Sequence, residues 1–101
     1  MRLTDRQREE IKWAAAESFG DGAHIWLFGS RVHDDRRGGD IDLYVESDLE
    51  DPEAALDALL KFRVELTRRL GERKIDVVLR RNPRVPEQPI HRIAKEEGVE
   101  L

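Results

Sequence analysis

The chain has 101 residues, 39% hydrophobic and 40% charged, and this length predicts a single domain spanning residues 1–101. It contains no cysteine, which excludes disulfides, thiolate zinc sites and cysteine nucleophiles, so any metal site must use oxygen or histidine ligands. A net charge of -4 weighs against a broad nucleic-acid-binding surface. The sequence has no run of about 18 apolar residues and no basic-then-apolar start, which predicts a cytoplasmic protein without a membrane span.

The first half of the chain is expected to form a helix followed by two strands. Thr4 and Gln7 have the spacing of a capping box and predict a helix over residues 4–19. Residues 24–28 form a short β-prone apolar run, and residues 40–45 alternate with period two, so each segment is a predicted strand. The link between the strands has about a dozen residues, which favours antiparallel or mixed pairing with a single helical turn in the link.

The second half predicts a helix, a strand and a last helix. Asp51-Pro52 begins an amphipathic helix that ends at Gly71, residues 74–79 form a third strand, and a short helix lies near residues 90–97. Because a helix connects the second and third strands, these two strands can lie parallel. The expected fold is therefore α/β, with a three-stranded mixed sheet flanked by helices.

Three aspartates on the predicted strands are candidate metal ligands. Asp40 and Asp42 are two residues apart, so their side chains leave one face of the strand with Cα atoms roughly 7 Å apart. Such a pair alone is more typical of a solvated polar face. Asp76 lies in the apolar run 75–79, which is typical of a strand covered on both faces. A buried acid in such a strand costs free energy unless a metal ion or a charged partner balances it. If the two strands are neighbours, the three carboxylates converge, as one or two Mg²⁺ ions require.

The loop after the first strand is a candidate phosphate site. Gly29 lacks a Cβ, which permits close approach of an anion, and Ser30 adds a hydroxyl and a backbone N–H. The alternative is an ordinary helix start with serine as the N-cap. Arg31, Arg36 and Arg37 follow; their charges suit a triphosphate, but an arginine-rich solvated loop is an equal interpretation, and Arg31 is retained as the binding candidate.

Aromatic side chains are the remaining candidates for nucleotide contact. Trp13 and Trp26 fall in apolar patterns, so we expect both to pack in the core rather than to stack on adenine. Tyr44 shares a strand face with Asp40 and Asp42, and this position predicts that it borders the nucleotide pocket.

The order of these residues on three successive strands resembles the nucleotidyltransferase superfamily of DNA polymerase beta. The matching motifs are Gly29-Ser30, Asp40-Ile41-Asp42 and Asp76. The resemblance extends over about residues 23 to 80. In its short length the chain resembles the minimal nucleotidyltransferase (MNT) branch, whose members are often antitoxin partners of HEPN-domain ribonuclease toxins.

The resemblance also implies a role for each motif residue. Gly29 and Ser30 are expected to hold the β and γ phosphates of ATP. Asp40 and Asp42 are expected to ligate both metal ions. Asp76 is expected to ligate the catalytic Mg²⁺ beside the attacking hydroxyl and to favour deprotonation of that hydroxyl.

By the same resemblance, the expected activity is transfer of AMP from ATP to a tyrosine of a HEPN toxin, with which this chain forms a hetero-oligomer. The toxin supplies the acceptor that a chain of this length cannot grip alone. Two alternatives remain open. One is a non-catalytic antitoxin that neutralises the toxin by binding, and the other is nucleotidyl transfer to a small molecule such as an aminoglycoside, which usually needs an additional acceptor-binding domain.

Overall fold

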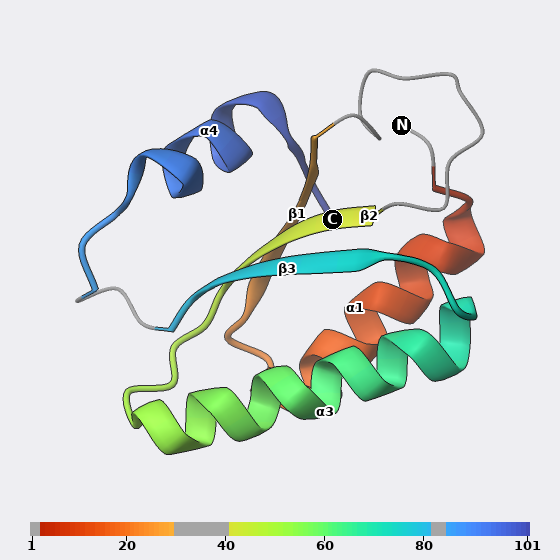
Figure 1. Ribbon diagram of the computed structural model, residues 1–101, viewed down its shortest axis with the longest axis horizontal. Helices are drawn as coiled ribbons and strands as arrows, with labels where there is room; N and C mark the ends of the chain where they lie inside the picture. The colour runs from red at the N-terminus through yellow and green to blue at the C-terminus, as the bar shows by residue number, and fades with distance from the viewer. Residues whose placement is uncertain (1–2, 30–40, 82–84) are drawn as a thin grey trace.

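The computed structural model describes residues 3–29, 41–81 and 85–101 (Figure 1). The single helical turn expected between the first two strands lies outside these residues. The elements are α1 (Asp5–Phe19), β1 (His24–Phe28), β2 (Ile41–Glu46), α3 (Pro52–Leu70), β3 (Ile75–Arg80), α4 (Pro89–Glu97) and β4 (Val99–Glu100). Each predicted helix and strand that falls on described residues is present, with bounds that differ from the prediction by at most one residue.

The strands form a mixed sheet. Within the described residues the sheet has four strands in the order β3-β2-β1-β4. β1 pairs antiparallel with β2, as the short link favoured, and β2 pairs parallel with β3, as the helix between them allows. The predicted count of three strands was wrong, because β4 adds antiparallel to β1. β4 has two residues, too few to produce a period-two pattern.

The two long helices begin at the predicted caps. The Thr4 hydroxyl accepts a hydrogen bond from the Gln7 backbone N–H at 3.0 Å, and the Gln7 side chain accepts one from the Thr4 N–H at 3.0 Å. Asp51 accepts from the Glu53 N–H at 3.1 Å and precedes Pro52. These bonds satisfy N–H groups that have no partner within the helix, so the capping motifs fix where α1 and α3 start.

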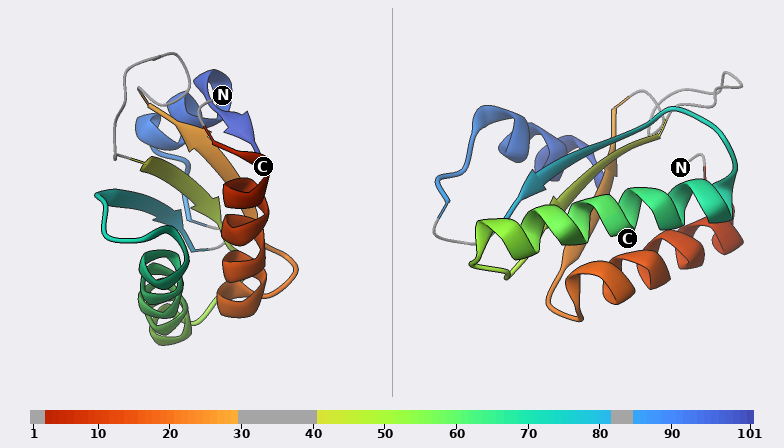
Figure 2. Two further views of the ribbon diagram at one scale, coloured as in Figure 1. Left: turned by 90° about the vertical axis from the view of Figure 1, so that its right-hand side faces the viewer. Right: turned by 60° about the horizontal axis from the view of Figure 1, so that its bottom comes forward.

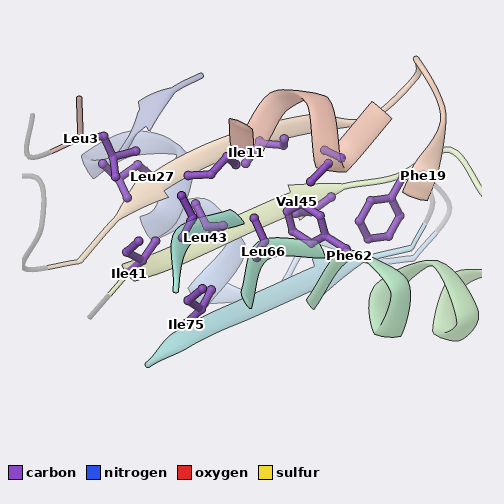
Figure 3. Packing of buried hydrophobic residues seen from close by; sticks show 14 of the residues in the cluster. Leu3, Ile11, Phe19, Leu27, Ile41, Leu43, Val45, Phe62, Leu66 and Ile75 are labelled. Atoms are coloured by element: carbon purple, nitrogen blue, oxygen red, sulfur yellow. The ribbon is translucent and has the colours of Figure 1, made fainter. Parts of the chain in front are cut away.

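The hydrophobic core lies between the sheet and the pair α1 and α3, which run side by side on one face of it (Figure 2). Alternate residues of β2 point into this core, and the rings of Phe19 and Phe62 meet edge to face at 5.4 Å (Figure 3). The expectation that Trp13 is a core residue was wrong. Its side chain is 48% exposed, and the Arg69 guanidinium lies 3.8 Å from the centre of its ring.

The short helix α4 covers part of the opposite face of the sheet (Figure 1). It packs against β1 and β2, where the Tyr44 ring stacks on His91 at 5.2 Å between ring centres. Trp26 is partly buried beside Tyr44, at 5.3 Å between ring centres, so it packs on this face of the sheet and not in the main core where it was expected. Among the described residues, no helix is long and apolar enough to cross a membrane.

Candidate active site

The pairing of the strands brings Asp42 and Asp76 together. Asp42 is the register partner of Asp76 on β3 and of Phe28 on β1. Neighbouring strands lie about 4.8 Å apart, and register partners in a sheet project to the same face. The predicted convergence is therefore confirmed for these two aspartates. Asp40, the third carboxylate, lies outside the described residues, as do Ser30 and Arg31.

Gly29 places the end of β1 directly against the Asp42 carboxylate. Its φ is +80°, a left-handed conformation that favours glycine. A Cβ at this position would also collide with Oδ2 of Asp42 and would lie 3.1 Å from its Cγ. Both the backbone conformation and the space next to Asp42 therefore require glycine, and the candidate phosphate loop starts beside the candidate metal ligand.

Asp76 is accessible from solvent. The expectation that both faces of β3 are covered was wrong, because Ile75 is buried but Asp76, on the opposite face, is exposed. Within the described residues, β3 also forms one edge of the sheet. The Asp76 side chain is 53% exposed, and its Oδ2 lies 3.9 Å from Nζ of Lys74, whose side chain is itself 68% exposed. The acid is therefore not a costly buried charge. It is a carboxylate that a hydrated cation or a substrate can reach.

The donor set suits a hard divalent cation. Mg²⁺ takes oxygen ligands, keeps several waters and is bound in nucleotide sites by one or two carboxylates together with substrate phosphates. Asp42 and Asp76 can supply such carboxylates from adjacent strands. In the part of the chain that the structure describes, no group of three or more His, Cys, Asp or Glu side chains could hold a metal ion. The site as described thus rests on the pair Asp42 and Asp76.

The same sheet face is closed two residues further along. Tyr44 is 0% exposed beneath α4, and its hydroxyl donates a hydrogen bond to Oε2 of Glu46 at 2.6 Å. The expectation that Tyr44 borders the nucleotide pocket was therefore wrong, because its ring is sealed between Trp26 and His91. Burial, together with the hydrogen bond to Glu46 and the negative charge of Glu46, raises the pKa of Tyr44 far above its ordinary value.

Glu46 is the centre of an ionic cluster that holds α4. Its Oε2 lies 3.1 Å from Nζ of Lys95 on α4 and 3.5 Å from Nη1 of Arg80 on β3. Burial alone would raise the pKa of Glu46, but hydrogen bonds from Tyr44 and Lys95 and the charges of Lys95 and Arg80 lower it. Sequence reasoning missed this cluster. The alternation of β2 places Glu46 on the face of Asp42 but does not show that α4 covers it.

A scan against protein families finds one whose model matches most of the chain. The family model described as "Polymerase beta, Nucleotidyltransferase" matches residues 9–99, from within α1 to β4. The matched segment includes Gly29, Asp42 and Asp76 together with the whole of β1, β2 and β3. A comparison with curated proteins finds no match.

Proposed function

We propose that this chain, which belongs to the polymerase beta nucleotidyltransferase family, transfers AMP from ATP to a tyrosine of a partner HEPN-domain toxin. The proposed reaction depends on Mg²⁺, and through it the chain acts as the antitoxin. The observation that carries the proposal is the register pairing of Asp42 with Asp76, with Gly29 packed against Asp42. This arrangement offers carboxylate oxygens for a cation beside the turn at which the candidate phosphate loop begins.

The proposed reaction is one displacement at phosphorus. The tyrosine oxygen bonds to the α-phosphorus, the bond from that phosphorus to the oxygen bridging to the β-phosphorus breaks, and pyrophosphate leaves. Mg²⁺, when bound, supplies positive charge that offsets the negative charge of the triphosphate and of the leaving group. We assign Asp42 and Asp76 as its ligands, with Asp40 as the third, and assign to Asp76 the further role of favouring loss of the tyrosine proton.

The exposure of Asp76 supports a macromolecular acceptor. Its carboxylate lies on an edge strand and is half exposed, so a tyrosine on the surface of another folded protein can approach it without unfolding. Tyr44, two residues after Asp42, is sealed under α4 and does not compete as an acceptor. The toxin is thus proposed to bring its tyrosine to the open end of β2 and β3.

The test is intact-mass analysis of the partner. The purified chain is incubated with Mg²⁺, each of the four nucleoside triphosphates in turn, and the toxin encoded by the neighbouring gene. We expect an adduct of AMP mass on a toxin tyrosine with ATP, and loss of the adduct with Asp42→Ala. Asp57→Ala is the matched control, because Asp57 is an exposed aspartate on α3, away from the site.

Two results would overturn the proposal. Full transfer by Asp42→Ala, with its fold verified by circular dichroism, would remove Asp42 from the reaction. Toxin neutralisation that needs no ATP and survives the loss of both Asp40 and Asp42 would show that the chain neutralises by binding alone.

A further inference from the structure

A stripe of exposed apolar side chains runs along the outer face of α3. Leu56, Leu60 and Val64 are 54%, 54% and 58% exposed, and their spacing of four residues places them on one side of the helix. The opposite side of α3 carries Phe62 and Leu66, which are fully buried in the core. Exposed apolar residues in a continuous row are typical of an interaction surface.

A shallow, open hollow lies along the stripe. This hollow, of about 420 Å³, is lined by Leu60, Arg63, Val64, Thr67 and Arg68. The first four of these residues have the spacing i, i+3, i+4, i+7, which is the hole of knobs-into-holes packing between helices. An apolar knob from a neighbouring helix would fill it.

The charges along this face favour an antiparallel copy of the same helix. Glu53 lies seven residues before Leu60. Arg68 lies eight residues after Leu60, on the same side of α3 by helix geometry, and its Nη1 also pairs with Oε1 of Glu65 at 2.9 Å. If a second α3 runs antiparallel with the two Leu60 side chains at the centre, Leu56 of the second copy reaches the hollow. Glu53 of that copy then comes level with Arg68, so acidic and basic ends face each other twice.

We propose that α3 pairs with α3 of a second copy of this chain in antiparallel orientation, about a two-fold axis at Leu60. The interface uses Leu56, Leu60 and Val64 as its apolar centre, with Glu53 and Arg68 as its charged ends. Such a contact is isologous, so the same residues meet on both copies. A single helix pair buries less than the roughly 1,200–2,000 Å² typical of stable complexes, so we expect a dimer that dissociates in about the micromolar range.

The proposed dimer leaves the candidate active site open. Asp42 and Asp76 project from the face of the sheet that α4 partly covers, whereas α3 lies on the other face (Figure 1). Dimerisation and nucleotidyl transfer are therefore separable properties, and failure of one does not imply failure of the other.

The first test is sedimentation equilibrium of the full chain over about 1 to 500 µM, a range that brackets a micromolar dissociation constant. We expect the mass to rise with concentration from the 11.7 kDa of one chain towards twice that value. Leu60→Glu should remain monomeric, since it places two acids together at the two-fold axis. Ile93→Glu, at a 45% exposed position on α4, is the matched control and should dimerise normally. A wild-type monomer at all concentrations, or a Leu60→Glu dimer of unchanged affinity, would overturn the proposal.

A charge exchange identifies the occupant of the stripe. Glu53→Arg and Arg68→Glu should each weaken the dimer by about tenfold, because each substitution brings like charges together twice. The double variant should recover the wild-type affinity, since exchange within one chain restores complementarity in a dimer of identical chains. Failure of the double variant to recover, or loss of toxin binding in Leu60→Glu with wild-type protein monomeric, would instead assign the stripe to a different protein.

Discussion

One face of the sheet carries acidic side chains at both ends, of which one end is covered by α4 and the other is open to solvent. At one end, Glu46 is enclosed by Tyr44, Arg80 and Lys95 beneath α4. At the other end, four residues earlier on β2, Asp42 lies opposite Asp76, whose side chain is half exposed. The strands and the face are the same at both ends, so the difference comes from what covers them.

The comparison separates an acid that holds the fold from acids that can serve a ligand. The ionised form of Glu46 is already stabilised by protein hydrogen bonds and cations, which is why its pKa is lowered. Asp76 sits at an edge strand, where its long, exposed pair with Lys74 contributes little stability. An exposed carboxylate in register with another carboxylate can supply oxygen ligands of the kind that a divalent cation takes.

The largest expected effect is a loss of nucleotidyl transfer on substitution at the open end, where Asp76 lies. Asp76→Asn should lower nucleotidyl transfer by more than about 100-fold, because even outer-shell partners of metal ligands cost 10–100-fold when they are removed. Its free energy of unfolding should change by less than about 0.5 kcal/mol, as for ordinary surface substitutions. The measurements are initial rates of AMP transfer and urea denaturation. A large loss of stability, with transfer retained, would make Asp76 a structural acid like Glu46.

A smaller loss of transfer is expected on substitution of Gly29, and Gly71 provides a matched control. Both residues have positive φ, +80° and +85°, but a Cβ would meet Asp42 at Gly29 and nothing within 4 Å at Gly71. Gly29→Ala and Gly71→Ala should each cost about 1–3 kcal/mol of unfolding free energy through backbone strain. Gly29→Ala should also lower transfer, by about tenfold or more, because it displaces Asp42, the proposed metal ligand. Equal activity of the two variants would show that Gly29 does not position Asp42.

Much of the fold could be predicted because its determinants are local. The capping box at Thr4 and the Asp51-Pro52 start fix helix ends through neighbouring residues, and the helix between β2 and β3 permits their parallel pairing. β4 could not be predicted, because its two residues pair with β1, far away in sequence. Trp13 was misassigned for a similar reason. Arg69, from α3, covers its ring and allows it to remain at the surface.

The candidate site was predicted in part for a related reason. Alternation in a strand shows which residues share a face, and the condition that the second and third strands are neighbours, which the structure meets, brings Asp42 beside Asp76. Alternation does not show what lies on that face. Tyr44 was therefore placed beside a pocket, whereas α4 seals it. β3 was expected to be covered on both faces, although Asp76 is exposed.

The smallest expected effect concerns the covered end and depends on pH. The pKa of Glu46 is lowered below its ordinary value of 4.5 in the folded protein, so its carboxylate stabilises the fold above that pH and loses this contribution as the pH falls through the lowered pKa. Glu46→Gln keeps the shape but removes the charge, and should cost about 1–2 kcal/mol of unfolding free energy at pH 7 with transfer nearly unchanged.

Urea denaturation of wild type and Glu46→Gln from neutral to acidic pH measures this contribution directly. The difference between the two unfolding free energies should shrink below pH 4.5, because a protonated Glu46 carries no charge for Lys95 and Arg80 to stabilise. A difference that stays constant with pH would mean that Glu46 acts through its shape and its bond from Tyr44, and not as the counter-ion that holds α4. In that case the two ends of the face would differ in exposure but not in the use they make of charge.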